Sequence, residues 1–192
     1  MQNDSRPLAV GCGTCSALSW ALLRPTWNWW KAPASPGWRE SPDRCFNVSH
    51  AGELALIAVA GHEVGVDVEH VASGWRALEA AGLACTPEEA DALRKLPAVQ
   101  RAETFVRWWT AKEAYLKATG QGFSIPPDRV EVAALSAGAA APVRVVDDGP
   151  SRWWVRRLRP APGYVGAVAA EGPDWQLRLR QSDPEALAER HA

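Results

Sequence analysis

The sequence lacks the features that would direct a protein to a membrane or to nucleic acid. Its formal net charge is −1, so there is no excess of either sign to attract a polyanion or an anionic lipid surface. No apolar run approaches the roughly 20 residues of a membrane span. The short apolar segment 16–23 has no basic region before it and does not resemble a secretory signal. We therefore expect a cytoplasmic protein whose partners include neither membrane nor nucleic acid.

Cysteine is also scarce, and its four positions are too few for a disulfide framework in a chain of 192 residues. Cys12 and Cys15 form a C-x-x-C pair, but no second such pair and no H-x-x-x-H motif is present to complete a zinc site. We expect reduced thiols. The alternative for Cys12 and Cys15 is a redox or metal-binding role.

The chain divides into three stretches of different character. Residues 1–44 are rich in tryptophan and proline and show no helical or strand periodicity beyond a short helix expected at 16–23. We expect this stretch to be irregular. Residues 45–172 carry clear helix and strand patterns and are expected to form a folded domain, and residues 173–192 are expected to form a C-terminal tail.

Two helices can be placed from their end signals. Thr86, Pro87 and Glu89 form a capping box with proline at the first helical position, which predicts a helix through Leu96. A longer helix is expected from about 101 to 119, ending at Gly120. At least one of Trp108 and Trp109 on this helix is expected in the core.

Alternating apolar residues predict strands on both sides of these helices. Residues 54–60 and 64–69 are separated by Gly61-His62-Glu63, and we expect them to form an antiparallel hairpin. Further strands are expected at 130–132, 143–146, 153–158 and 164–170. The predicted fold class is therefore α+β, with an antiparallel sheet packed on the long helix.

The chemistry begins with Asp67 and Glu69, which flank Val68 in an apolar strand. Residues two apart in a strand point to the same face, so the two carboxylates would repel each other. Burying them requires a positive neighbour, and Mg²⁺ is a cation that takes such oxygen ligands together with substrate phosphate. The alternative is that both lie at a solvated strand end.

The long helix adds Lys112, Glu113 and Lys117. Glu113 and Lys117 are four residues apart and share one face of the helix. They can be an exposed ion pair, or a carboxylate that joins a metal beside an ammonium that holds phosphate. Similarly, His50 alone after Ser49 can be a turn histidine rather than a ligand.

Three motifs occur in order: Phe46-Asn47-Val48-Ser49-His50, Gly65-Val66-Asp67-Val68-Glu69, and Trp109-Thr110-x-Lys112-Glu113-Ala114-x-x-Lys117. Together they resemble the motifs of the Sfp-type 4′-phosphopantetheinyl transferases, and the resemblance implies that residues 45–172 form the catalytic domain. The resemblance covers about 45–172 and implies the fold of that family, with a C-terminal lobe that is largely complete. Only 45 residues precede Phe46, and no Gly-Lys-Pro element precedes it, so we expect a shortened or altered N-terminal lobe. One hypothesis is that part of 16–44 is translated out of the ancestral frame.

The resemblance implies transfer of the 4′-phosphopantetheine arm of coenzyme A to a serine of an apo acyl, peptidyl or aryl carrier protein, as in polyketide or nonribosomal peptide biosynthesis. Adenosine 3′,5′-bisphosphate would be released. It implies Mg²⁺, with Mn²⁺ possible, held by Asp67, Glu69 and Glu113. Glu113 and Lys117 would be catalytic, and coenzyme A would be bound by Ser49, His50, Lys112 and Lys117. The alternatives are a truncated inactive remnant and a non-enzymatic module that binds a carrier protein.

Overall fold

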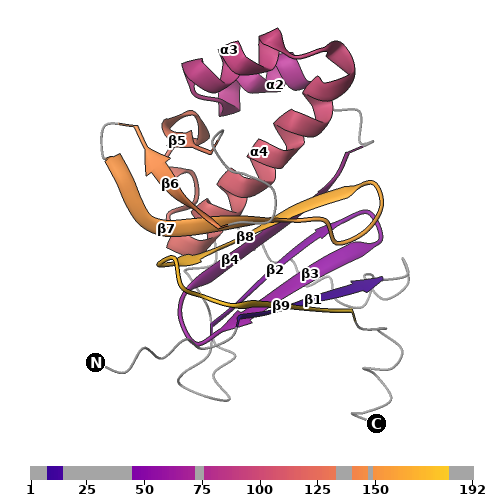
Figure 1. Cartoon of the computed structure of the whole chain (residues 1–192), viewed down its shortest axis with the longest axis vertical. Coiled ribbons are helices and arrows are strands. Elements are labelled where there is room, and N and C mark those ends of the chain that lie inside the picture. The colour runs from indigo at the N-terminus through magenta and orange to yellow at the C-terminus, as the bar shows by residue number, and fades with distance from the viewer. Residues whose placement is uncertain (1–7, 15–44, 72–75, 133–139, 147–148, 182–192) are drawn as a thin grey trace.

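The structure is a computed structural model that describes residues 8–14, 45–71, 76–132, 140–146 and 149–181. In this part of the chain, two sheets and a long helix lie in layers, with the second sheet between the first sheet and the helix (Figure 1). Two shorter helices lie against one end of the long helix. The α+β class predicted from the sequence is confirmed.

The first sheet has the strand order β2-β3-β1-β9. Strands β2 (Cys45–Ala51) and β3 (Leu54–Ala60) form an antiparallel hairpin, with Ala51 opposite Leu54 and Gly52 at a φ of 54° in the turn. Strand β1 (Leu8–Thr14) pairs antiparallel with β3, and β9 (Leu177–Gln181) pairs parallel with β1. The sheet is therefore assembled from segments far apart in the sequence.

The second sheet is antiparallel throughout, in the order β4-β8-β7-β6-β5. Its strands are β4 (Val64–His70), β8 (Tyr164–Glu171), β7 (Gly149–Leu158), β6 (Ala141–Val145) and β5 (Val130–Glu131). All four strands expected after the long helix are present. The second sheet packs against the first through Leu56 and Ala58 of β3, Val66 and Val68 of β4, and Val168 of β8, all of them buried.

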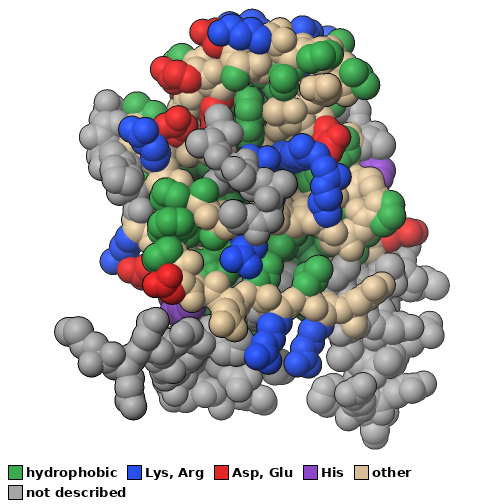
Figure 2. Space-filling view, viewed as in Figure 1, with side chains coloured by type: hydrophobic (Ala, Val, Ile, Leu, Met, Phe, Trp, Pro, Cys, Tyr) green, Lys and Arg blue, Asp and Glu red, His purple; other side chains and the backbone are tan. Residues whose placement is uncertain are grey.

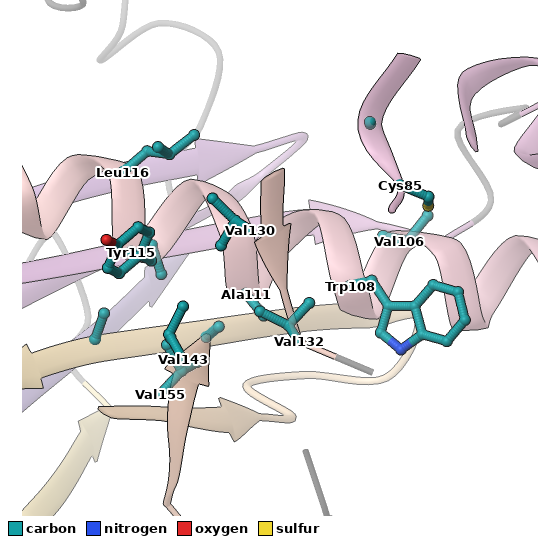
Figure 3. Close-up of a cluster of buried hydrophobic side chains, with 14 of the residues drawn as sticks. Cys85, Val106, Trp108, Ala111, Tyr115, Leu116, Val130, Val132, Val143 and Val155 are labelled. Carbon is teal, nitrogen blue, oxygen red and sulfur yellow. The ribbon is translucent and has the colours of Figure 1, made fainter. Parts of the chain in front are cut away.

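Helix α4 (Ala98–Thr119) covers the other face of the second sheet. It begins three residues before the predicted start and ends at Gly120, whose φ of 66° confirms the predicted C-terminal stop. Trp108 is 6% exposed, which confirms a core role for one of the paired tryptophans. Figure 3 shows Trp108, Ala111 and Tyr115 of α4 with Val143 and Val155 from the sheet.

Two short helices precede α4. Helix α3 (Pro87–Lys95) carries the predicted capping box, with the Thr86 side chain accepting from the Glu89 N–H and the Glu89 carboxylate accepting from the Thr86 N–H. Helix α2 (Ala77–Ala84) was not predicted. No helix among the described residues is both long enough and apolar enough to span a bilayer. Charged side chains of both signs are interspersed over the face seen in Figure 2.

The predicted hairpin of 54–60 with 64–69 was wrong. Strand β3 pairs with β2 and β1, whereas β4 pairs with β8 in the other sheet. The difference lies in burial: β4 is covered on both faces and its first five residues are all buried, while β3 exposes Ile57 at 45%. The short connection at 61–63 therefore links a strand of the first sheet to a strand of the second, and does not form a hairpin turn.

The expectation that 1–44 is irregular was wrong for Leu8–Thr14, and the expected tail contributes β9. Gly11 and Gly13 lower the strand propensity of β1, which hid it from a pattern search. Cys12 lies in β1, while Cys15 and the helix expected at 16–23 fall outside the described residues. Cys45 and Cys85 carry thiols, and burial raises the pKa of the Cys85 thiol to about 11.

Candidate functional site

Asp67 lies at the centre of β4, only 4% exposed, on the face that α4 covers. Its Oδ1 accepts hydrogen bonds from Ser49 Oγ at 2.8 Å and from Lys117 Nζ at 2.7 Å. Its Oδ2 is buried and has no hydrogen-bond partner within the described part of the chain. Burial raises the pKa of Asp67 against the opposing effects of Lys117 and Ser49. This carboxylate is therefore only half satisfied by the protein.

Strand β2 holds β4 in place through side chains, although the two strands belong to different sheets. Asn47 Oδ1 accepts from the Val66 N–H at 3.0 Å, and Ser49 Oγ accepts from the Val68 N–H at 3.3 Å. Asn47 and Ser49 are two apart and point to the same face of β2. Asn47 was missed as a site residue, although its spacing from Ser49 was the available signal.

His50 follows Ser49 directly in β2, so its side chain points to the opposite face of the strand. It is exposed, whereas Ser49 is buried. The structure therefore brings Ser49, but not His50, into contact with Asp67. A role for His50 with a ligand would have to involve a part of that ligand distant from the carboxylates.

Glu69 and Glu113 lie close to Asp67, from β4 and α4 respectively. Burial raises the pKa of Glu113 to about 7, and the negative charge of Asp67 adds to the effect while Lys117 opposes it. The pKa of Glu69 is also raised to about 7, first by burial and then by Asp67 and Glu113; Lys117 and a hydrogen bond from Trp109 oppose the rise. Glu113 Oε1 is buried without a hydrogen-bond partner in the described residues.

A close approach of two backbones places Glu113 over β4. A Cβ added to Gly65 would lie 2.0 Å from the Ala114 carbonyl oxygen and 2.4 Å from the Ala118 nitrogen. Only glycine fits between β4 and α4 at this point. Gly65 is two residues from Asp67, and Ala114 adjoins Glu113, so this contact sets the distance between the two carboxylates.

Lys112 lies elsewhere. Its side chain is 1% exposed, and its ammonium donates to Glu89 Oε2 at 2.6 Å, the Ala84 carbonyl at 2.6 Å and the Pro127 carbonyl at 2.9 Å. All three ammonium protons are used by protein oxygens. The prediction that Lys112 binds phosphate does not fit this arrangement, because consecutive helical residues point about 100° apart and Lys112 turns away from β4. Its partner Glu89 is also the carboxylate of the capping box at the start of α3.

The carboxylates fit a hard divalent cation by their chemistry. Two buried acceptor oxygens, Asp67 Oδ2 and Glu113 Oε1, have no hydrogen-bond partner among the residues that the structure describes, and a positive charge would relieve the repulsion between the three carboxyl groups. Within the described ranges, no three His, Cys, Asp or Glu side chains already form a ligand group. A cation would therefore have to draw them together, with water and phosphate completing its coordination.

Comparison with known proteins places this arrangement in a family. The model of the 4′-phosphopantetheinyl transferase superfamily matches residues 63–169, which include the Asp67, Glu69, Glu113 and Lys117 positions. The 4′-phosphopantetheinyl transferase HetI of Nostoc sp. is 36% identical over 135 residues, covering 70% of this chain and 54% of HetI. The 4′-phosphopantetheinyl transferase Sfp of Bacillus subtilis is 28% identical over 146 residues, covering 76% of this chain and 63% of Sfp.

The chain thus spans little more than half of HetI and less than two thirds of Sfp. The family match includes β4, α4 and β8, the elements that position the carboxylates and build the core beneath them. This chain belongs to the 4′-phosphopantetheinyl transferase superfamily.

Proposed function

We propose that this protein transfers the 4′-phosphopantetheine arm of coenzyme A to a serine hydroxyl of an apo acyl, peptidyl or aryl carrier protein. The observation that carries this proposal is the cluster of Asp67, Glu69 and Glu113 beside Lys117, in which two buried carboxylate oxygens have no hydrogen-bond partner from the described ranges of the chain. Transfer from a pyrophosphate requires both charge neutralisation and a base, and this cluster has groups for each.

In the proposed reaction the carrier serine oxygen forms a bond to the β-phosphorus of coenzyme A. The bond from that phosphorus to the bridging oxygen breaks, and its electron pair leaves with adenosine 3′,5′-bisphosphate. The serine proton passes to Glu113, directly or through a water. Without a cation, burial and the charge of Asp67 raise the pKa of Glu113 to about 7, so it is a stronger base than an ordinary glutamate; a bound cation would lower this pKa and keep the carboxylate ionised near neutral pH.

Asp67, Glu69 and Glu113 would hold Mg²⁺, or Mn²⁺ in its place. When bound, such a cation supplies charge neutralisation on the pyrophosphate oxygens. Ser49 acts through Asp67, whose Oδ1 it orients by a 2.8 Å hydrogen bond. The buried position of that hydroxyl supports a positioning role for Ser49 more than direct contact with coenzyme A.

Lys117 is the cation best placed to hold a pyrophosphate oxygen. Its ammonium is 2.7 Å from Asp67 Oδ1, and its side chain is 11% exposed. His50, exposed at the other face of β2, would donate to a more distant phosphate of coenzyme A. Lys112 has no part in phosphate binding in this proposal, because three protein oxygens already occupy its ammonium.

The test is transfer of a fluorescent coenzyme A label to an apo carrier protein in the presence of Mg²⁺. The wild-type protein is expected to label the carrier serine, and Glu113→Gln to lose most of that activity. Glu88→Gln is the matched control, since Glu88 is exposed on α3. Carrier binding without label transfer would instead support a binding module. Loss of both would support an inactive remnant.

A further inference from the structure

The buried Lys112–Glu89 pair joins five parts of the chain. Lys112 of α4 contacts Glu89 of α3, the Ala84 carbonyl at the end of α2 and the Pro127 carbonyl. Glu89 in turn accepts from the Thr86 N–H at 3.1 Å and, through Oε1, from the Val132 N–H at 2.8 Å. Both carboxylate oxygens and the whole ammonium are therefore satisfied at a single junction.

This junction is almost entirely shielded from water. Lys112 is 1% exposed and Glu89 is 0% exposed. A buried ion pair is weak evidence for stability, because desolvation offsets much of the attraction and apolar residues often serve as well. Its distinctive property is directional: three hydrogen bonds orient the Lys112 ammonium and so restrain the helix that carries it.

Helix α4 is thus held from two sides at the same turn. The Gly65 contact fixes its distance from β4, since Ala114 and Ala118 lie against that glycine. Core packing holds α4 on the second sheet, and even a small rotation of the helix about its axis would turn Glu113 away from Asp67. The bonds of Lys112, one residue from Glu113 and about 100° round the helix, oppose that rotation.

We propose that Lys112 and Glu89 are a positioning pair that sets the rotation of α4 and so aims Glu113 at Asp67. This inference rests on the proposed function. Lys112 is therefore expected to affect kcat and cation affinity, but not the KM for coenzyme A, because it does not contact that substrate. A phosphate-binding lysine would show the opposite pattern.

The test uses Lys112→Met combined with Glu89→Gln, because either change alone leaves an unpaired charge in the core. The double variant is expected to keep its KM for coenzyme A within about twofold, while kcat falls by about ten- to a hundredfold through misplacement of Glu113. Its Kd for Mn²⁺, measured by titration calorimetry, is expected to rise by about tenfold. Lys95→Met, an exposed lysine on α3, should leave all three values unchanged.

Two results would overturn the inference. A raised KM for coenzyme A with unchanged kcat would make Lys112 a phosphate ligand, and unchanged kcat and Mn²⁺ affinity in a folded double variant would make the pair merely structural. If the wild type transfers nothing, the proposed function fails, and the Mn²⁺ comparison still decides the inference. If the double variant does not fold, Lys112→Arg replaces it. Arginine keeps the charge but cannot reproduce the compact three-oxygen contact, so the same losses are expected and their absence would refute the pair's role.

Discussion

The carboxyl groups of Glu69 and Glu113 hold their protons to a higher pH than ordinary glutamates do. Burial is the main cause for both, and the charge of Asp67 adds to it. Such groups are held in their charged form at a cost to the folded protein. A bound cation would neutralise these carboxylates and remove that cost. The residues that lower the stability of the metal-free protein would therefore bind the cation in the metal-bound protein.

This cost predicts how the stability of the metal-free protein depends on pH. The pKa of Glu113 is about 7 in the folded protein against 4.5 as its ordinary value. Because the folded state binds the proton more tightly, the stability from this group is fully present below pH 4.5 and is lost as pH rises through 7. Glu113→Gln should therefore raise the free energy of unfolding at pH 8 by about 1–2 kcal/mol in EDTA, as measured by urea denaturation. Glu88→Gln should not, and an equal pH slope in wild type and Glu113→Gln would contradict the raised pKa.

The two lysines of the helical motif show which site details the sequence could predict. Lys112 and Lys117 were both expected to bind phosphate, and Lys117 was expected to be catalytic as well. Only Lys117 reaches Asp67, because its position on α4 directs it to β4, while Lys112 points toward α2 and α3. The residue types at the site were readable from the motifs. Predicting where each lysine side chain points would require the rotational orientation of α4. That orientation depends on contacts with Glu89, 23 residues earlier in the chain than Lys112.

At the scale of elements, the packing of α4 on β4 depends on one glycine. Gly65→Ala would place a Cβ 2.0 Å from the Ala114 carbonyl oxygen, and backbone cannot yield as a side chain can. We expect a loss of about 3 kcal/mol or more in the free energy of unfolding, as for overpacked core sites, together with weakened Mn²⁺ binding.

Gly82→Ala is the matched control for this substitution. Gly82 lies within α2 with nothing within 4 Å of an added Cβ, so alanine should stabilise the protein by about 0.5–1 kcal/mol. Urea denaturation of both variants measures the difference. Equal stability of Gly65→Ala and wild type would show that α4 does not approach β4 as closely as described.

Elements with local signals were predicted well, and pairing between strands was not. The capping box at Thr86 and Glu89 and the stop at Gly120 depend on neighbouring residues. The start of α3 and the end of α4 could therefore be predicted from the sequence. The pairing of β3 with β1 and of β4 with β8 joins residues far apart in the chain. A period of two identifies a strand but does not select its partner.

At the scale of the whole molecule, segments outside the expected catalytic domain help to close the fold. Trp175 follows β8, is 6% exposed and packs in the core between the two sheets, with the Arg156 guanidinium 4.9 Å from the centre of its ring. Strand β9 then runs beside β1. Residues 177–181 of the expected tail are thus part of the first sheet.

Removing the Trp175 side chain should therefore destabilise the protein strongly. Trp175→Ala is expected to lower the free energy of unfolding by about 3–5 kcal/mol, as for other buried aromatic residues. Val99→Ala, at a position 86% exposed on α4, should change it by no more than about 0.5 kcal/mol. Thermal unfolding of the two variants measures the difference. A Trp175→Ala variant as stable as wild type would show that Trp175 does not stabilise the core between the two sheets.

The proposed transfer reaction depends on Asp67, Glu69 and Glu113 forming one cation site. Titration with Mn²⁺ tests this site most directly. Calorimetry at pH 8 should show one Mn²⁺ bound per wild-type chain, with affinity reduced by about tenfold or more in Asp67→Asn and in Glu113→Gln and unchanged in Glu88→Gln. Wild-type protein that binds no Mn²⁺, or that binds it as tightly after either substitution, would contradict the site.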